Sequence, residues 1–201
     1  MPRPKASAKS KAPGVLERLR PEETAAVLHR LLSQHPELRS EAQQFATELI
    51  SVPSMQDVSE DAYSRITSID LEALNGRAGA HSWGYVEPSE AATELLSEAL
   101  ENLVEDMKRS AELGLVSAAG VVCAGIVDGL YRARHTNSDG ALGWAVDFPI
   151  DEAGFVVEEF LEACPPAARK AAHASLMQVL AERVPEWAEC FKRAAERRGS
   201  E

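Results

Sequence analysis

The residues whose types best suit binding lie in a short glycine-rich segment, residues 75–88. Arg77, His81, Trp83 and Tyr85 fall within nine positions of it. Tryptophan, tyrosine and arginine often anchor protein interfaces, and nearby glycines let a partner's backbone approach closely. We therefore predict a binding surface here. The alternative is that the tryptophan fills the end of a helical pair as part of the core.

Asp128 is the second candidate, because it ends a run of residues without charge, 113–127. A buried carboxylate needs a partner. Arg132 lies four residues later, the favourable order for an ion pair on a helix. We predict a structural pair at the edge of the core; the alternative is a functional carboxylate. Trp144, in a second unusual loop at 136–149, joins the binding residues if the two loops lie side by side.

Known catalytic and metal-binding signatures are missing from the sequence. It holds no ExxH, HExxH, GxSxG, P-loop or GxGxxG pattern. Cys123, Cys164 and Cys190 are odd in number and far apart, which argues against a disulfide framework or a zinc site and fits a reducing cytoplasm. We predict no catalytic residue, no metal and no cofactor, although an enzyme remains the alternative.

Four glutamates of residues 88–113 share one helical face: Glu94, Glu98, Glu101 and Glu105. Such a face could bind a divalent cation or a basic partner. Because polar faces of amphipathic helices usually contact water, we favour a solvated surface.

The element that must position these residues is the apolar run from Leu113 to Val127, which continues as a helix to about residue 134. A helix that is hydrophobic all round belongs in a core or a membrane. The run is shorter than the roughly 20 residues of a membrane span, so we predict a buried central helix and no span. Gly125 and Gly129 lower helix propensity, and we expect a neighbouring helix to pack closely against them.

Amphipathic segments surround this run in the sequence. Proline and acidic residues mark helix starts at 21, 36, 88, 150 and 185, and Gly114 marks a helix end. No run alternates with period two. We therefore predict an all-α fold: an array or bundle of about nine antiparallel helices, α-solenoid-like, around the central helix near 113–134.

The predicted domain organisation is simple. Residues 1–13 read as a disordered basic tail carrying Arg3, Lys5, Lys9 and Lys11, and residues 14–201 as a single domain. A shift of 61 residues superposes Trp83 on Trp144, which suggests pseudo-repeat units near 83–113 and 144–174. The alternative is that proline and acidic residues simply mark most helix starts.

Charge limits the classes of partner. The net charge is −11, and because residues 1–12 contribute +4 the rest carries −15. An acidic body repels phosphate, so nucleic acid is an expected partner only through the basic tail. We predict a non-enzymatic, cytoplasmic interaction or scaffold module that binds an unknown protein or peptide. The alternative is a small-ligand-binding protein or enzyme with a cleft around Arg77, His81, Trp83, Tyr85 and Asp128.

Overall fold

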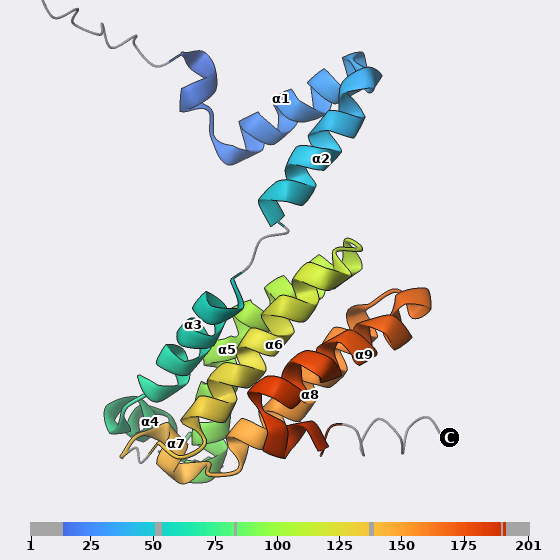
Figure 1. Cartoon of the computed structure of the whole chain (residues 1–201). Helices are drawn as coiled ribbons and strands as arrows, with labels where there is room; N and C mark the ends of the chain where they lie inside the picture. The colour runs from blue at the N-terminus through green and yellow to red at the C-terminus, as the bar shows by residue number, and fades with distance from the viewer. Residues whose placement is uncertain (1–13, 51–53, 83, 137–138, 190, 192–201) are drawn as a thin grey trace, which may run out of the picture. The chain divides into compact units, whose positions relative to one another are not determined.

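A computed structural model describes residues 14–50, 54–82, 84–136, 139–189 and 191 (Figure 1). The predicted basic tail, Trp83 and Cys190 lie outside the described residues. The chain divides into two units, residues 1–47 and 48–201, and each is described by itself below.

The first unit is a pair of helices with short 3₁₀ turns. Its elements are η1 (Val15–Arg18), α1 (Pro21–Gln34), η2 (Pro36–Leu38) and α2 (Arg39–Ile50). The start of α1 follows the predicted signals: Pro21 is its first residue, and the Arg20 backbone N–H donates to the Glu23 carboxylate at 2.9 Å. No residue of α1 is buried, so the apolar stripe around Leu28 and Leu31 is exposed.

The second unit is helical apart from one small hairpin, which confirms the all-α prediction. Its elements are α3 (Met55–Thr67), α4 (Leu71–Arg77), β1 (Gly79–His81), β2 (Gly84–Val86), α5 (Pro88–Glu112), α6 (Val116–Ala133), α7 (Ala141–Trp144), α8 (Phe148–Ala163) and α9 (Pro166–Arg183). Residues 185–189 are also helical. The long helices α5, α6, α8 and α9 alternate in direction along the chain (Figure 1).

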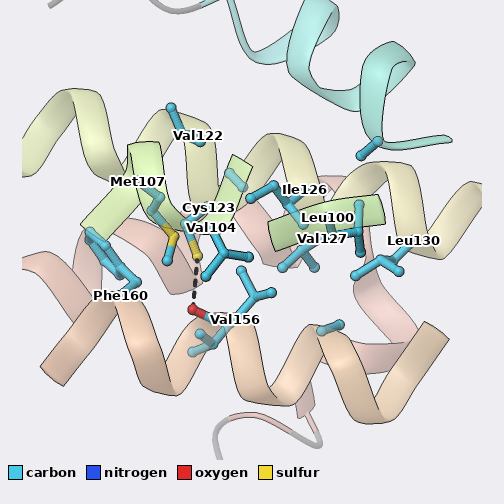
Figure 2. Close-up of a cluster of buried hydrophobic side chains, with 14 of the residues drawn as sticks. Leu100, Val104, Met107, Val122, Cys123, Ile126, Val127, Leu130, Val156 and Phe160 are labelled. Atoms are coloured by element: carbon cyan, nitrogen blue, oxygen red, sulfur yellow. Dashed lines mark hydrogen bonds between the residues drawn. The ribbon is translucent and has the colours of Figure 1, made fainter. Parts of the chain in front are cut away.

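Helix α6 lies at the centre of this unit and packs against α3, α5, α8 and α9. Figure 2 shows the layer in which α6 meets α5 and α8. The labelled side chains there are Leu100, Val104 and Met107 of α5, Val122, Cys123, Ile126, Val127 and Leu130 of α6, and Val156 and Phe160 of α8. Helix α6 is apolar enough to cross a membrane, with a mean hydropathy of 1.3, but 67% of it is buried by protein. This burial favours the predicted core helix over a span.

Two of the three glycines of α6, Gly125 and Gly129, face α3, which confirms the close packing of a neighbouring helix predicted at these positions. A Cβ atom on Gly125 would lie 2.7 Å from Val58 Cβ, and one on Gly129 would lie 2.7 Å from the Ser59 carbonyl oxygen and 2.8 Å from Ala62 Cβ. Contacts this short do not occur between real side chains and backbone. The close approach of α3 to α6 therefore depends on glycine at both positions.

Two described cysteines are unpaired, and both are buried. The Cys123 thiol points at the Val156 carbonyl, 4.0 Å away (Figure 2), and burial raises its pKa. Because Cys164 precedes Pro165 at a helix end, its place in the sequence predicts a more exposed thiol than that of Cys123. That expectation is wrong: the residue is 1% exposed, and burial raises its pKa as well.

The hairpin of β1 and β2 was not expected from the sequence. Its strands pair antiparallel, with Gly79 opposite Val86 and His81 opposite Gly84. Three-residue strands are too short to show a period of two. Gly79 and Gly84 have φ angles of 103° and 149°, which glycine adopts at little cost. Gly114, with φ 80°, confirms the predicted end of α5.

Candidate functional site

The predicted site residues lie in three different places, of which the first is the end of α4 and the hairpin. Arg77 ends α4 and forms ion pairs with Glu94 (3.2 Å) and with Glu98, both on α5. The Nε2 atom of His81 lies 2.8 Å from the Arg77 carbonyl oxygen, to which it donates. Tyr85 is 64% exposed on β2. Arg77 therefore ties α4 to the predicted acidic face.

The second place is the contact of α6 with α3. Asp128 is 9% exposed and accepts a hydrogen bond from the Ser59 hydroxyl at 2.6 Å. Ser59 in turn accepts from Arg132 Nη1 at 3.2 Å, and Arg132 Nη2 pairs with Glu60 at 2.9 Å. The guanidinium also lies 4.7 Å from the centre of the Tyr63 ring. The predicted partnership of Asp128 and Arg132 is thus indirect in the part of the chain that the structure describes: Ser59 lies between them.

The third place is a groove on the outer face of α5, α7 and α8, where Trp144 lies. The indole of Trp144 is 51% exposed, so this tryptophan is not a core residue, whereas Trp187 is 6% exposed and packs edge-on against Tyr131. Two adjoining cavities of about 550 and 490 Å³ form the groove and share the lining residues Glu152 and Phe155. We call it the α5–α8 groove; its other lining residues are Thr93, Ser97, Glu98, Glu101, Val104, Glu105, Lys108, Trp144, Ala145, Val146, Asp147, Phe148, Asp151 and Glu159.

Helices α5 and α8 form the two walls of the groove and run in the same direction. Ser97, nearer the start of α5, donates to Glu152 of α8 at 3.4 Å, and Lys108 pairs with Glu159 further along both helices. The α5 wall carries the acidic face that the sequence analysis identified. The α8 side and α7 add the apolar surface: Phe155 is 51% exposed and Val146 is 75% exposed.

The charge of the groove is strongly negative. Seven carboxylates line it against the single lysine at 108. Within the described residues, only two of the seven have an ion-pair partner: Glu98 with Arg77, and Glu159 with Lys108. The pKa of the Glu152 carboxyl is raised overall, because the effect of burial outweighs the opposing effect of the hydrogen bond from Ser97. The groove therefore holds negative charge that the described residues of the second unit leave largely uncompensated.

These carboxylates do not form a metal site. Among the residues that the structure describes, no group of three or more histidine, cysteine, aspartate or glutamate side chains is arranged to hold a metal ion. The glutamates of α5 follow one another along a wall rather than converging on a point. Their arrangement suits an elongated cationic partner better than a single ion.

A third cavity, of about 460 Å³, lies between α6 and α9. Apart from Ser117 and Ser175 its lining is apolar, and it is built largely of small residues such as Gly120, Ala124 and Ala172. It contains no charged group, so it offers little basis for selecting one partner over another. None of these three cavities is lined by Arg77, His81, Tyr85 or Asp128, the described residues of the predicted alternative cleft, whose fifth member, Trp83, lies outside the described residues.

Phe155 and Glu152 were missed by the sequence analysis. A signal for them exists: Phe155 lies three residues after Glu152 and four before Glu159, so an aromatic side chain shares a helical face with acidic ones. An exposed aromatic in an acidic face is unusual for a solvated surface. Helix α7 brings Trp144 to the same groove, but no pattern in the sequence around Trp144 indicates that it lies there.

Comparisons with known protein families, with characterised proteins and with solved structures found no match to this chain.

Proposed function

We propose that this protein is a non-enzymatic interaction module that binds another protein through the α5–α8 groove. The observation that carries the proposal is the pair of half-exposed aromatic side chains, Trp144 and Phe155, in an acidic groove. Large aromatic side chains dominate the energetics of protein interfaces. In water they are costly to expose, so a surface that presents two of them together is best explained by a partner.

The internal contacts of three other predicted site residues support this choice. Arg77 is engaged by two glutamates, and Asp128 and Arg132 are engaged through Ser59. Such contacts give these three side chains a role in holding helices together. The groove residues, by contrast, have few partners within the described residues. We further propose a cytoplasmic location, which the two buried free thiols support.

Site-specific photo-crosslinking tests the proposal. A photoreactive amino acid is placed at Val146, which lines the groove and is 75% exposed, and in a control protein at Leu71, which is 45% exposed on α4. We expect an adduct with one cellular protein from position 146 and not from position 71. The adduct should disappear when Trp144→Ala and Phe155→Ala are combined with the probe. Equal adducts from both positions, or an adduct that survives the double substitution, would refute the proposed function.

A further inference from the structure

We propose that the segment bound in the α5–α8 groove is a basic amphipathic helix. Its lysine or arginine side chains would face the glutamates of α5 and Glu152, and its apolar side chains would cover Phe155 and Trp144. This inference rests on the interaction function proposed above and names the chemistry of the partner.

The charge of the groove selects a cationic partner. Glu101 and Glu152 line it without an ion-pair partner in the described part of the chain, and Glu105 interacts with Lys108 only at longer range. Bringing nucleic acid or an anionic lipid surface against them would place like charges together, which costs free energy. A cationic side chain in the same place would be attracted from a distance and would gain hydrogen bonds on arrival.

The distribution of apolar and acidic residues calls for an amphipathic segment. The α5 wall supplies most of the carboxylates, whereas α7 and α8 supply Trp144, Val146 and Phe155. A partner that is basic all round would leave the aromatic rings exposed, and one that is apolar all round would desolvate the carboxylates without compensation. Only a segment with one basic and one apolar face satisfies both sides of the groove.

The shape of the groove favours a helix over an extended strand. Its walls are helices whose backbone groups bond within the helix, so it offers no free strand edge for a peptide to extend. Glu98, Glu101 and Glu105 follow one another at spacings of three and four residues, and a partner helix presents its own side chains at the same intervals. The α5 wall from Thr93 to Lys108 is about 22 Å long at 1.5 Å per residue, which matches roughly four turns of a partner helix.

Glu152 is the residue that we expect to discriminate between partners. Its side chain lies between α5 and α8, where it receives a 3.4 Å hydrogen bond from Ser97 and no other from the residues that the structure describes. A partly buried carboxylate without a cation is unfavourable, and burial already raises its pKa. A lysine or arginine from the partner would supply the missing counter-charge. A bound cation would therefore lower the free energy of the Glu152 carboxylate relative to that in the empty groove.

Binding of designed peptides to the full chain tests this inference. The probe is a labelled 16-residue peptide of lysine, leucine and alanine that forms an amphipathic helix, compared with a scrambled peptide of the same composition and with spermine as a small polycation. Binding is followed by fluorescence anisotropy. We expect the amphipathic peptide to bind at least about tenfold more tightly than the scrambled one, because only it places both faces correctly. Its affinity should fall as salt is added.

Matched variants locate the binding. Glu152→Gln should weaken binding about tenfold, whereas Glu72→Gln, which makes the same change in net charge on the exposed surface of α4, should change it less than about twofold. Phe155→Ala should weaken binding about tenfold, and Leu71→Ala should not. Circular dichroism of each variant checks that the fold is retained.

Three outcomes would overturn the inference: equal affinity of the two peptides, equal effects of Glu152→Gln and Glu72→Gln, or displacement of the peptide by spermine at comparable concentration. In each case the attraction would follow net charge alone. The failure of the inference is distinct from that of the function. If position 146 crosslinks to a protein whose contacting segment is acidic or extended, the interaction function stands and the basic helix is wrong.

Discussion

Replacing Gly129 by alanine should destabilise the second unit, although the same change usually stabilises a helix. In a helix interior alanine is favoured over glycine by about 1 kcal/mol. At Gly129, however, the new Cβ would lie 2.7 Å from the Ser59 carbonyl oxygen and 3.1 Å from the Tyr63 nitrogen, both backbone atoms of α3. Normal contact would require α3 to move away by about 0.7 Å or more.

The size of the effect follows from these opposing terms. Overpacking of a core costs roughly 1–3 kcal/mol, and here the moving segment also carries Ser59, whose hydrogen bond to Asp128 would lengthen. Weakening this hydrogen bond costs about 1 kcal/mol, which roughly cancels the gain in helix propensity, so we expect Gly129→Ala to lower the free energy of unfolding by about 1–2 kcal/mol, the lower part of the overpacking range. At this chain length that corresponds to a fall in Tm of about 3–6 °C.

Gly154→Ala provides the matched control. Gly154 lies inside α8, and a Cβ there would meet no heavy atom within 4 Å. Only the propensity term applies, so this variant should be more stable than the natural protein by about 0.5–1 kcal/mol. The two glycine-to-alanine changes should thus shift stability in opposite directions.

Tryptophan fluorescence during urea and thermal unfolding is a suitable measurement, because all three tryptophans lie in residues 48–201 and report on the second unit alone. If Gly129→Ala melts at or above the natural protein, or if both variants shift in the same direction, the close packing of α3 on α6 described above is wrong.

Three further predictions follow from buried groups. Ser59→Ala should lower the free energy of unfolding by about 1–3 kcal/mol, because it removes the hydroxyl that donates to the buried Asp128 carboxylate; unchanged urea unfolding would contradict this. Glu152→Gln should stabilise the free protein at neutral pH, since the folded-state pKa of Glu152 is raised. That gain should disappear as the pH falls well below about 4.3, the unfolded-state pKa of glutamate, because the carboxyl is then protonated in both folded and unfolded states, and a gain independent of pH would show that burial of the charge is not its cause. Cys123 and Cys164 should react with iodoacetamide far more slowly in the native protein than in urea, as followed for each peptide by mass spectrometry, and rapid native labelling of either thiol would show that it is not buried.

The sequence predicted the central helix and its close contacts well, because these depend on local composition. An uncharged run of 15 residues is typical of a helix buried on all sides, and glycines spaced by four on such a helix indicate a close neighbour. The predicted start of α5 at Pro88 and its predicted end before Gly114 were also accurate, because the residues within one turn of a helix end determine where the helix stops.

The groove was much less predictable, because it depends on how distant helices meet. The acidic face of α5 was recognised, but nothing local indicates that Phe155, about 50 residues later, lies opposite it. Helix α7 is four residues long, too short for a periodic signal, yet it places Trp144 at the groove. Cys164 shows the same limit: proline after a helix predicts an end of the helix, but not what covers that end.

The central position of α6 also has a consequence for synthesis of the chain on the ribosome. Its packing partners α3 and α5 precede it in the chain, whereas α8 and α9 follow it. From the end of α6 to the end of α9 the ribosome adds 50 residues, which takes roughly 3–10 s at ordinary rates of elongation. During that interval the most apolar helix of the protein has only part of its surface covered. The nascent chain is therefore most vulnerable to aggregation, and most in need of chaperones, after its hydrophobic centre has already been made.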